Sequence, residues 1–276
     1  MPLAHPDGIV QGAAARGLGV GAFNVIQLEF AEAIVAGAEK AGQPVILQIS
    51  QNCVKYHRAL APIAVACLAL ARQAAVPVAV HLDHAESAEL IGEALDLGFN
   101  SIMYDGSRLP DEANRAATAA ITALAHARGV WVEAELGEVG GKDGVHAPGA
   151  RTDPADAAQF VADTGVDSLA VAVGSSHAMV TRTACLDLEL IAALRQAVPV
   201  PLVLHGSSGV PDADLARAVA AGMTKINIAT LLSKTFTASV RTSLDLATSL
   251  VDTRKYFVPA RDQVAEAVAR LLEVIA

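Results

Sequence analysis

Three histidines and three acids stand at the ends of apolar stretches of this sequence, where side chains could do chemistry. They are His84, His177, His205, Asp83, Asp105 and Glu135. Three imidazoles around one open coordination position make a catalytic zinc site. The histidines lie too far apart in the chain for a zinc finger, so only a tertiary fold could bring them together. The sequence therefore predicts a metal-binding active site assembled from separate segments.

Two chemistries suit a pocket of imidazoles and carboxylates. One is hydrolysis by a metal-bound water, and the other is carbanion chemistry, in which a metal polarises a carbonyl and a carboxylate moves the α-proton. Two segments of small residues favour the second, namely 206–209 (GSSG) and 227–230 (NIAT). Taken alone GSSG is also an ordinary turn, but backbone N–H groups and small hydroxyls in these loops commonly bind phosphate in an α/β barrel. We therefore expect a phosphorylated substrate.

The elements that must position these residues alternate along the chain. Short apolar runs rich in β-branched residues predict strands that are buried on both faces. There are eight, at 19–25, 44–50, 77–84, 101–107, 130–136, 168–176, 201–208 and 224–230. Helical stretches follow at 29–42, 59–75, 86–97, 111–129, 154–164, 187–197 and 211–222. Several of them begin at a capping residue or a proline and end at a glycine, which supports their bounds.

Eight βα repeats in about this length predict a (β/α)8 barrel of the TIM type, in the α/β class. An open doubly wound sheet would need a G-x-G-x-x-G turn after its first strand, and Ile26-Gln27-Leu28 stands there instead. No domain boundary is visible, so we expect residues 1–276 to form a single domain. In such a barrel the active site lies at the carboxyl ends of the strands, where the polar residues stand.

Two regions interrupt the alternation. Residues 137–153 mix glycines, charges and a proline without periodicity, and a loop of this length is more often functional than not. We expect it to be a long mobile loop after the fifth strand. The tail, 251–276, ends in the helix-like run VAEAVARLLEVI. It predicts a C-terminal helical extension that caps the barrel or packs on a neighbouring subunit.

The composition limits the class of protein. Apolar residues make up 53% of the chain, which excludes disorder. The net charge of −9 and the absence of a Lys/Arg cluster exclude a nucleic-acid partner. No uncharged apolar run reaches the roughly 18 residues of a transmembrane helix, and no signal peptide is visible. The three cysteines are scattered, which fits a reducing compartment. We therefore expect a cytoplasmic protein without a membrane partner.

Four motifs carry a resemblance to a known family. They are His-Leu-Asp-His at 81–84, Val-Glu-Ala-Glu-Leu-Gly at 132–137, Leu-His-Gly-Ser-Ser at 204–208 and Lys-Ile-Asn-Ile-Ala-Thr at 225–230. In this order and spacing the sequence resembles the class II, zinc-dependent ketose-bisphosphate aldolases, which include the fructose- and tagatose-bisphosphate aldolases. The resemblance covers nearly the whole chain. It implies reversible cleavage of a ketose 1,6-bisphosphate to dihydroxyacetone phosphate and glyceraldehyde 3-phosphate.

The resemblance also implies a role for each residue of the pocket. The catalytic Zn2+ ion would be bound by His84, His177 and His205, with Asp105 and Glu135 as outer or alternate ligands. Asp83 would be the base that moves the proton at the reacting carbon. The substrate-binding residues would be Asn24, Ser50, Gly206, Ser208, Asn227, Ala229, Thr230 and Arg261. The last of these would reach the far phosphate from a neighbouring subunit, and the family often places a monovalent cation, Na+ or K+, beside the phosphate.

The sequence departs from the family at three positions. Ala178 follows the second zinc histidine, where the family usually has glycine, and Val180 stands where the family tends to have an aromatic residue. In the loop the family commonly has Gly-Gly-x-Glu-Asp, whereas 140–144 (GGKDG) is one residue shorter. Asp143 either replaces the glutamate that handles the alcohol proton, as a catalytic acid, or matches the aspartate and leaves the glutamate missing.

Other functions stay open on the sequence alone. Lys225 on the eighth strand could form a Schiff base as in lysine-dependent aldolases, although the three histidines would then have no role. The remaining alternatives are a zinc-dependent hydrolase, a sugar-phosphate binding protein without activity, and an aldolase for a modified phosphosugar from polyol catabolism. The sequence does not distinguish fructose from tagatose bisphosphate, which differ at one hydroxyl configuration. Arg261 and the apolar C-terminal helix predict a homodimer or homotetramer.

Overall fold

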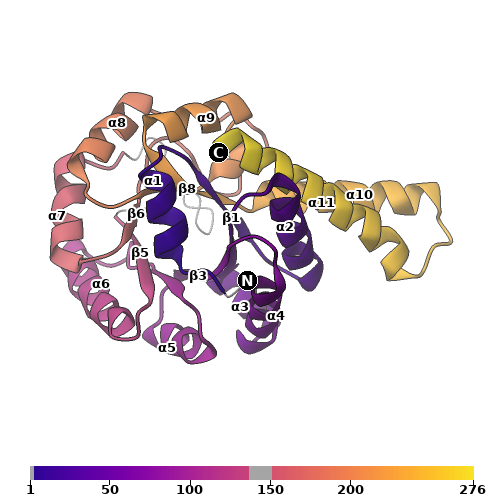
Figure 1. The fold of residues 1–276 in the computed structure, drawn as a ribbon, viewed down its shortest axis with the longest axis horizontal. Coiled ribbons are helices and arrows are strands. Elements are labelled where there is room, and N and C mark those ends of the chain that lie inside the picture. Colours follow the sequence, from indigo (N-terminus) through magenta and orange to yellow (C-terminus); the bar gives the residue numbers. More distant parts are fainter. Residues whose placement is uncertain (1–2, 137–150) are drawn as a thin grey trace.

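The structure is a computed structural model that describes residues 3–136 and 151–276. Within these ranges, parallel strands form a closed barrel in chain order, with β8 pairing back onto β1. The strands are β1 (Val20–Asn24), β2 (Val45–Ser50), β3 (Val78–Ala85), β4 (Ser101–Tyr104), β5 (Trp131–Glu135), β6 (Ser168–Ala170), β7 (Leu202–Leu204) and β8 (Met223–Ile228). The eight-stranded barrel predicted from the sequence is confirmed (Figure 1).

Helices surround the barrel on the outside (Figure 1). They are α2 (Leu28–Ala41), α3 (Gln51–His57), α4 (Ala61–Gln73), α5 (Ala88–Leu97), α6 (Asp111–His126), α7 (Pro154–Thr164), α8 (Leu188–Ala197), α9 (Asp212–Ala221), α10 (Thr230–Leu246) and α11 (Thr253–Ile275). The predicted caps are present: the Ser87 hydroxyl accepts from Leu90 N–H, and the Asp153 carboxylate accepts from two N–H groups at the start of α7. In the described part of the chain no single helix could span a membrane by length and composition, and one bent pair, α3 with α4, passes that test only together.

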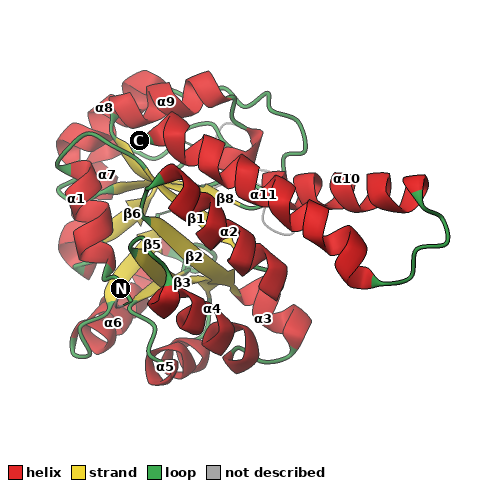
Figure 2. Ribbon diagram, turned by 45° about the vertical axis from the view of Figure 1, so that its right-hand side comes forward, coloured by secondary structure: helices red, strands yellow, loops and turns green. Residues whose placement is uncertain are grey.

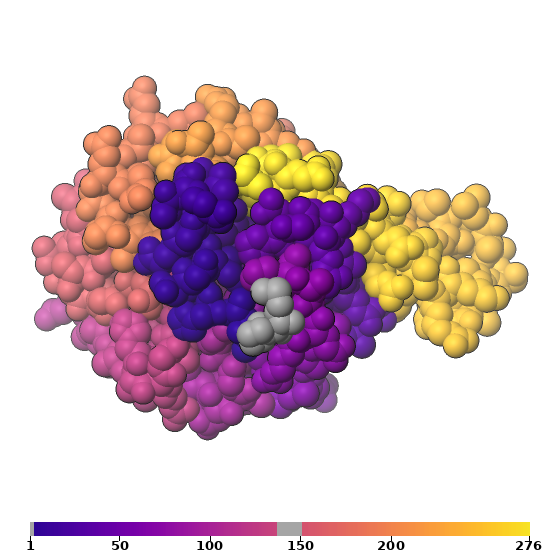
Figure 3. Space-filling view, in the orientation of Figure 1, coloured from indigo at the N-terminus to yellow at the C-terminus, as the bar shows by residue number. Residues whose placement is uncertain are grey.

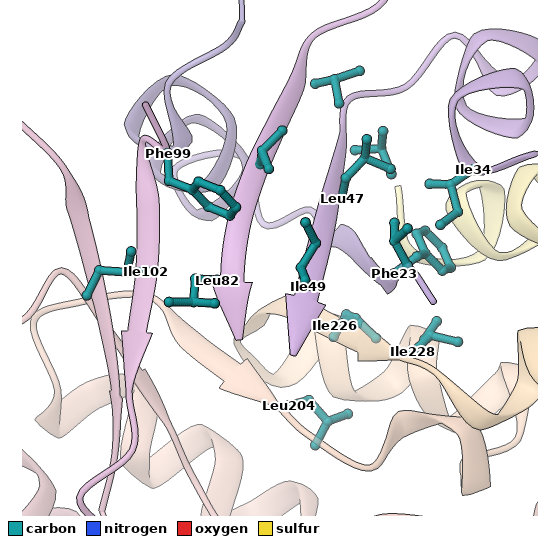
Figure 4. Packing of buried hydrophobic residues seen from close by; sticks show 14 of the residues in the cluster. Phe23, Ile34, Leu47, Ile49, Leu82, Phe99, Ile102, Leu204, Ile226 and Ile228 are labelled. Atoms are coloured by element: carbon teal, nitrogen blue, oxygen red, sulfur yellow. The ribbon is translucent and has the colours of Figure 1, made fainter. Parts of the chain in front are cut away.

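Each strand faces the helices with one residue and the barrel interior with the next, because side chains alternate across a strand. On β5, Val132 and Ala134 belong to the apolar cluster between strands and helices. Figure 4 shows Leu47 and Ile49 of β2 in the same cluster. This outer layer is mainly apolar, which is what a parallel barrel covered by helices requires.

The amino end of the barrel is closed by apolar residues. Interior side chains at this end form a cluster with the N-terminal segment that contains η1 (Asp7–Gln11) and α1 (Gly12–Ala14). The cluster consists of Ile9, Val10, Ala13, Val20, Ala22, Ile46, Ala79 and Trp131. Figures 1 and 3 show this segment lying across the barrel end that faces the viewer. A substrate therefore has to enter from the carboxyl ends of the strands.

The centre of the barrel interior is polar. Gln48, His81, Glu133 and Lys225 lie there, and none of them is more than 2% exposed. We call these four residues the middle layer. They are fixed by register, since Gln48 pairs with His81 between β2 and β3. The interior thus changes from apolar at the amino end, through the middle layer, to the ionisable residues at the carboxyl end.

Four elements differ from the sequence prediction. The apolar run 168–176 is a strand only over Ser168–Ala170, and α3 and α10 replace segments for which no helix was expected. α11 begins at Thr253, before the predicted helical run, and it contains Pro259. The rings of Phe236 on α10 and Phe257 on α11 lie 5.3 Å apart. Packing between these two helices outweighs the weak helix propensity of a Ser/Thr-rich segment and of a proline.

α10 and α11 form a pair that projects beyond the barrel (Figure 2). Leu246 at the end of α10 is 83% exposed, and Val251 in the connection is 88% exposed. Large apolar side chains in such positions gain nothing from the barrel itself. The predicted C-terminal helical extension is present as α11, and α10 adds a helix that was not expected.

Candidate active site

The three predicted histidines meet at the carboxyl end of the barrel. His84 lies near the end of β3, His205 directly follows β7, and His177 lies in the connection after β6. Their ring centroids are 4.7 Å apart for His84 and His205, 5.2 Å for His84 and His177, and 5.5 Å for the third pair. One ligand atom from each, and one from Glu135, lie within 4.8 Å of one another. Three imidazoles and a carboxylate at this spacing fit a tetrahedral metal ion.

Asp105 sets the orientation of His84. Its Oδ2 lies 2.8 Å from Nδ1 of His84, so the ring nitrogen that can bind a metal is Nε2. Asp105 also accepts from the hydroxyl of Ser107 at 2.6 Å. The clustered ligand group found among the described residues does not include Asp105. Of the two roles that the resemblance implied, this geometry matches the outer one.

His84 adopts an unusual backbone conformation. Its φ is +51°, in the left-handed region. Such a conformation costs a residue with a side chain about 1–2 kcal/mol. A residue stays in such a conformation only where the surrounding structure holds it there, and residues of this kind cluster at functional sites.

Glu133 orients His205 in the same way. Its Oε1 lies 3.0 Å from Nε2 of His205, and both side chains are fully buried. Nδ1 of His205 has no hydrogen-bond partner among the described residues and lies 3.5 Å from Oε2 of Glu135. Burial, together with the charges of His84 and His177, lowers the pKa of His205 well below its usual value. The ring is therefore neutral at pH 7, with a lone pair at Nδ1 that a metal can use.

Asp83 lies beside the histidines and is held ionised. Its Oδ1 is 4.0 Å from Nε2 of His84, and its Oδ2 accepts a hydrogen bond from Asn24 at 3.1 Å. Gln48, which the sequence reasoning missed, donates in turn to Asn24 at 2.7 Å. Burial alone would raise the pKa of Asp83, but the positive charges of His84 and Lys225 and the bond from Asn24 outweigh it and lower the pKa. An ionised carboxylate in this position can accept a proton.

Most of the predicted substrate-binding residues line one hollow together with two of the histidines, His84 and His177. Its lining includes Asn24, Ser50, Asp83, His84, His177, Gly206, Ser208, Asn227, Ala229 and Thr230. Gly206 has a φ of +69°, and a Cβ there would lie 2.5 Å from the carbonyl oxygen of Ser176. Only glycine fits this position, which lets the backbone approach the hollow closely.

The amino end of α10 closes the hollow on this side. The Ser208 hydroxyl accepts from the backbone N–H groups of Ala229 at 3.2 Å and Leu231 at 3.1 Å. The amide oxygen of Asn227 is buried and has no hydrogen-bond partner among the described residues. N–H groups at a helix start, a hydroxyl and small residues make a site suited to an anionic group.

Ala178 lies on the rim of the hollow. Its φ is +58°, so it occupies the left-handed region that glycine adopts without cost. The structure thus supplies a physical reason for the glycine that the family places here. Val180, the second departure, is 60% exposed and therefore lies on the surface.

A second hollow adjoins the first. The two share Ser50, Asn52, His84, His177 and Ala178. The second one is also lined by Lys55 of α3 and by Arg108, which follows β4, and neither was singled out from the sequence. Both follow a strand end by several residues, so a search restricted to the strand ends missed them. Nη1 of Arg108 lies 3.6 Å from Oε1 of Glu86, which lines the same hollow.

Two further residues of the sequence analysis, Arg261 and Lys225, do not line the hollows at the histidines. Arg261 on α11 donates to Glu32 on α2 at 2.8 Å and lines a separate hollow. Lys225 is 2% exposed, with Nζ 2.8 Å from Oε2 of Glu133, so its amine is not placed to form a Schiff base. Asp143 lies outside the described residues.

Comparisons with known proteins agree with this geometry. The sequence profile of a family described as "Fructose-bisphosphate aldolase class-II" matches residues 5–276. The "Fructose-bisphosphate aldolase" of Thermus caldophilus is 40% identical in a match of 294 aligned positions, and the match covers 96% of this chain and 95% of that protein. The "Fructose-bisphosphate aldolase" of Staphylococcus aureus is 37% identical over 272 residues, with 97% and 95% covered.

A solved structure has the same fold. The crystal structure of the YdjI aldolase from Escherichia coli K12 superposes with a TM-score of 0.87 at 32% sequence identity. The match covers 99% of this chain and 97% of that chain. Similarity in sequence and in structure therefore extends over nearly all of the chain.

Proposed function

Because the chain belongs to the class II fructose-bisphosphate aldolase family, we propose that it is a zinc-dependent aldolase with a ketose 1,6-bisphosphate as substrate. The family reaction is the reversible cleavage of such a sugar to dihydroxyacetone phosphate and glyceraldehyde 3-phosphate. The observation that carries the proposal is the group of His84, His177, His205 and Glu135 beside the Asp83 carboxylate.

The donor set favours zinc over other common ions. Three imidazoles with a carboxylate suit Zn2+, whereas Mg2+ and Ca2+ prefer oxygen ligands alone. His84 would bind through Nε2 and His205 through Nδ1, since the other nitrogen of each ring faces a carboxylate. When bound, zinc supplies a Lewis acid that polarises the ketose carbonyl.

Asp83 is the residue that moves the proton. Its pKa is lowered, so it stays ionised at neutral pH, and the Asn24–Gln48 pair fixes its position. A positioned base typically accelerates a reaction by about 10²–10⁴-fold. Asp143 is proposed as the acid for the alcohol proton, on the resemblance alone.

The shape of the site supports a position for the dihydroxyacetone half of the substrate. The phosphate of the dihydroxyacetone half would lie at Gly206, Ser208, Ala229 and Thr230, where small residues meet the amino end of α10, the positive end of the helix dipole. Asn227, whose buried amide oxygen lacks a described partner, would bind the hydroxyls beside the carbonyl. Binding energy from the phosphates would hold the carbonyl in place for reaction. A monovalent cation, Na+ or K+, would bind beside this phosphate.

The far phosphate and the assembly are proposed together. The apolar residues at the tip of the α10–α11 pair support a homodimer or homotetramer, in which a neighbouring subunit's Arg261 would reach the far phosphate. Size-exclusion chromatography with light scattering measures the subunit number. We also place the reaction in the cytoplasm, which is supported by the three cysteines, since all are free thiols.

Removal of the metal tests the proposal. Fructose and tagatose bisphosphate are assayed side by side before chelation, after chelation, and after Zn2+ is restored. We expect cleavage of at least one of them to disappear with chelator and return with Zn2+. Full activity in chelator would refute the metal-dependent mechanism.

The alternatives give different results in the same assays. An aldolase for a modified phosphosugar would exchange the α-proton of dihydroxyacetone phosphate with solvent but cleave neither bisphosphate. A zinc-dependent hydrolase would show neither exchange nor cleavage, and would act on esters or amides. A binding protein without activity would bind dihydroxyacetone phosphate without exchanging its proton, even with Zn2+ present.

A further inference from the structure

A buried ion pair lies beneath the proposed metal site, and neither of its members is among the residues proposed to touch substrate or metal. Glu133 of β5 and Lys225 of β8 belong to the middle layer, at 0% and 2% exposure. Oε2 of Glu133 lies 2.8 Å from Nζ of Lys225. Neither residue lines the two hollows at the histidines.

Stability does not explain this pair. Taking two charges out of water costs several kcal/mol, and replacing a buried ion pair by neutral residues of similar volume is often neutral or stabilising. The remaining interior of the barrel shows that apolar side chains can be accommodated, since the cluster at the amino end is apolar throughout. The pair therefore needs another reason to be where it is.

The second oxygen of Glu133 supplies that reason. Oε1 lies 3.0 Å from Nε2 of His205, while Oε2 faces Lys225. The carboxylate thus connects a buried cation on β8 to a metal-site histidine that follows β7. The same Oε2 that faces Lys225 also lies 4.0 Å from Nε2 of His81.

The direction of this connection determines which nitrogen His205 can offer. With Nε2 held by Glu133, Nδ1 is the atom that faces Glu135 and the other histidines. A ring rotated by half a turn about its Cβ–Cγ bond would lose the contact between Nε2 and Glu133. Carboxylates that hold metal-binding histidines in this way typically change metal affinity about 10–100-fold when they are mutated.

We propose that Glu133 is a positioning residue for the metal centre, and that Lys225 holds its carboxylate in the orientation that His205 needs. The inference rests on the proposed role of His205 as a metal ligand. Within the chain Lys225–Glu133–His205, the lysine acts on His205 only through the glutamate, and it lines neither of the two hollows at the histidines.

The test is the metal affinity of Glu133→Gln, measured on the intact protein by competition with a chelator for Zn2+. We expect binding weaker by about 10–100-fold. Co2+ substituted for Zn2+ gives a second readout, because its visible absorption reports ligand geometry. We expect the band to shift or broaden in the variant.

A double variant separates positioning from folding. Glu133→Gln alone leaves Lys225 buried without its partner, so it lowers the unfolding midpoint as well. Glu133→Gln with Lys225→Met removes both charges. We expect this double variant to recover most of the lost unfolding midpoint but none of the lost metal affinity. Recovery of both would overturn the proposal, because the pair would then matter only for folding.

Two matched variants complete the experiment. Ser168→Ala removes a comparably buried side-chain hydrogen bond, the one that the Ser168 hydroxyl accepts from Trp131 at 3.0 Å. Ser168 pairs with Glu133 through the backbone of β5 and β6, but this hydrogen bond does not involve the Glu133 carboxylate, so metal affinity should be unchanged. His205→Ala should weaken metal binding more than any other variant. If it does not, the metal-site proposal itself fails. If it does while Glu133→Gln binds Zn2+ as tightly as the unmodified protein, only the positioning role is refuted.

Discussion

The two faces of the barrel strands carry opposite chemistry. On β3, Val80 and Leu82 point outward and are fully buried among apolar residues, whereas His81 and Asp83 point inward among charges. Neighbouring positions on one strand thus serve different purposes. The outward face holds the barrel together by excluding water from apolar surface. The inward face places charged groups where burial is costly and where chemistry needs them.

This comparison predicts that substitutions on the two faces have separable effects. An outward variant should lower the free energy of unfolding and leave the metal centre intact in the molecules that remain folded. An inward variant at the carboxyl end should lower metal binding and activity with little effect on unfolding. Four experiments test that separation, in order of decreasing effect.

The largest effect is expected from a metal-binding histidine. His177→Ala removes one of the four clustered ligands from a connecting segment that is only half-buried. We expect cleavage to fall by at least about 10³-fold, because the carbonyl loses its Lewis acid. Steady-state kinetics and a Zn2+ titration measure the loss. A large drop of the unfolding midpoint alongside the loss of activity would show that the inward and outward faces do not have separable effects, and it would contradict the comparison.

The next effect is on stability alone. Leu82→Ala leaves a cavity in the fully buried outer layer, which should cost about 2–5 kcal/mol of unfolding free energy. Urea denaturation measures it. Leu28→Ala is the matched control, since Leu28 is 46% exposed and the change should stay within about 0.5 kcal/mol. Zn2+ affinity should be the same in both, and a loss in Leu82→Ala would contradict the prediction.

The inward histidines should make the metal-free protein sensitive to acid. Burial, before any neighbouring charge, lowers the pKa of His81 and His205 well below the usual value. Below about pH 6.5 the unfolded chain therefore binds protons that the folded chain does not, and stability falls by up to about 1.4 kcal/mol per pH unit for each histidine. The loss continues until the pH reaches the pKa of the folded state. Urea midpoints at about pH 7.5 and 5.5 measure it, and an unchanged or higher midpoint in acid would refute the prediction.

The smallest effect concerns the rim. Ala178→Gly should stabilise the protein by up to about 1 kcal/mol, because Ala178 has a φ of +58°. Ala127→Gly is the control of opposite sign, since Ala127 has a φ of −61° and should lose about 0.5–1 kcal/mol. Thermal unfolding of both variants compares them. A loss of stability in Ala178→Gly would show that the strain is compensated by contacts of the methyl group.

Much of the site could be predicted from strand ends. Residues at the ends of several apolar runs, such as Asn24, Ser50 and Asp83, line one hollow, because parallel strands bring their carboxyl ends to one face. A search of strand ends does not find Glu133 and Gln48. They lie two residues inside the strand, where a polar side chain looks like an exception in an apolar run. Counting alternate residues back from Glu135 and Ser50 would have found them.

The helical arm shows a different limit. Composition and caps predicted the helices that cover the barrel, but α10 and the first part of α11 depend on packing against each other. Local propensity cannot reveal such a pair, since each helix is stabilised by contacts with a segment elsewhere in the chain.

The sequence by itself determined the barrel, the carboxyl-end location of the site and its set of histidines and acids, because periodicity and residue type are local properties. The tertiary structure alone decided how those residues are used. It decided that Asp105 and Glu133 hold the rings of His84 and His205. It also decided that Lys225 is buried against a carboxylate. These are distances between residues on different strands, and they arise only when the barrel closes.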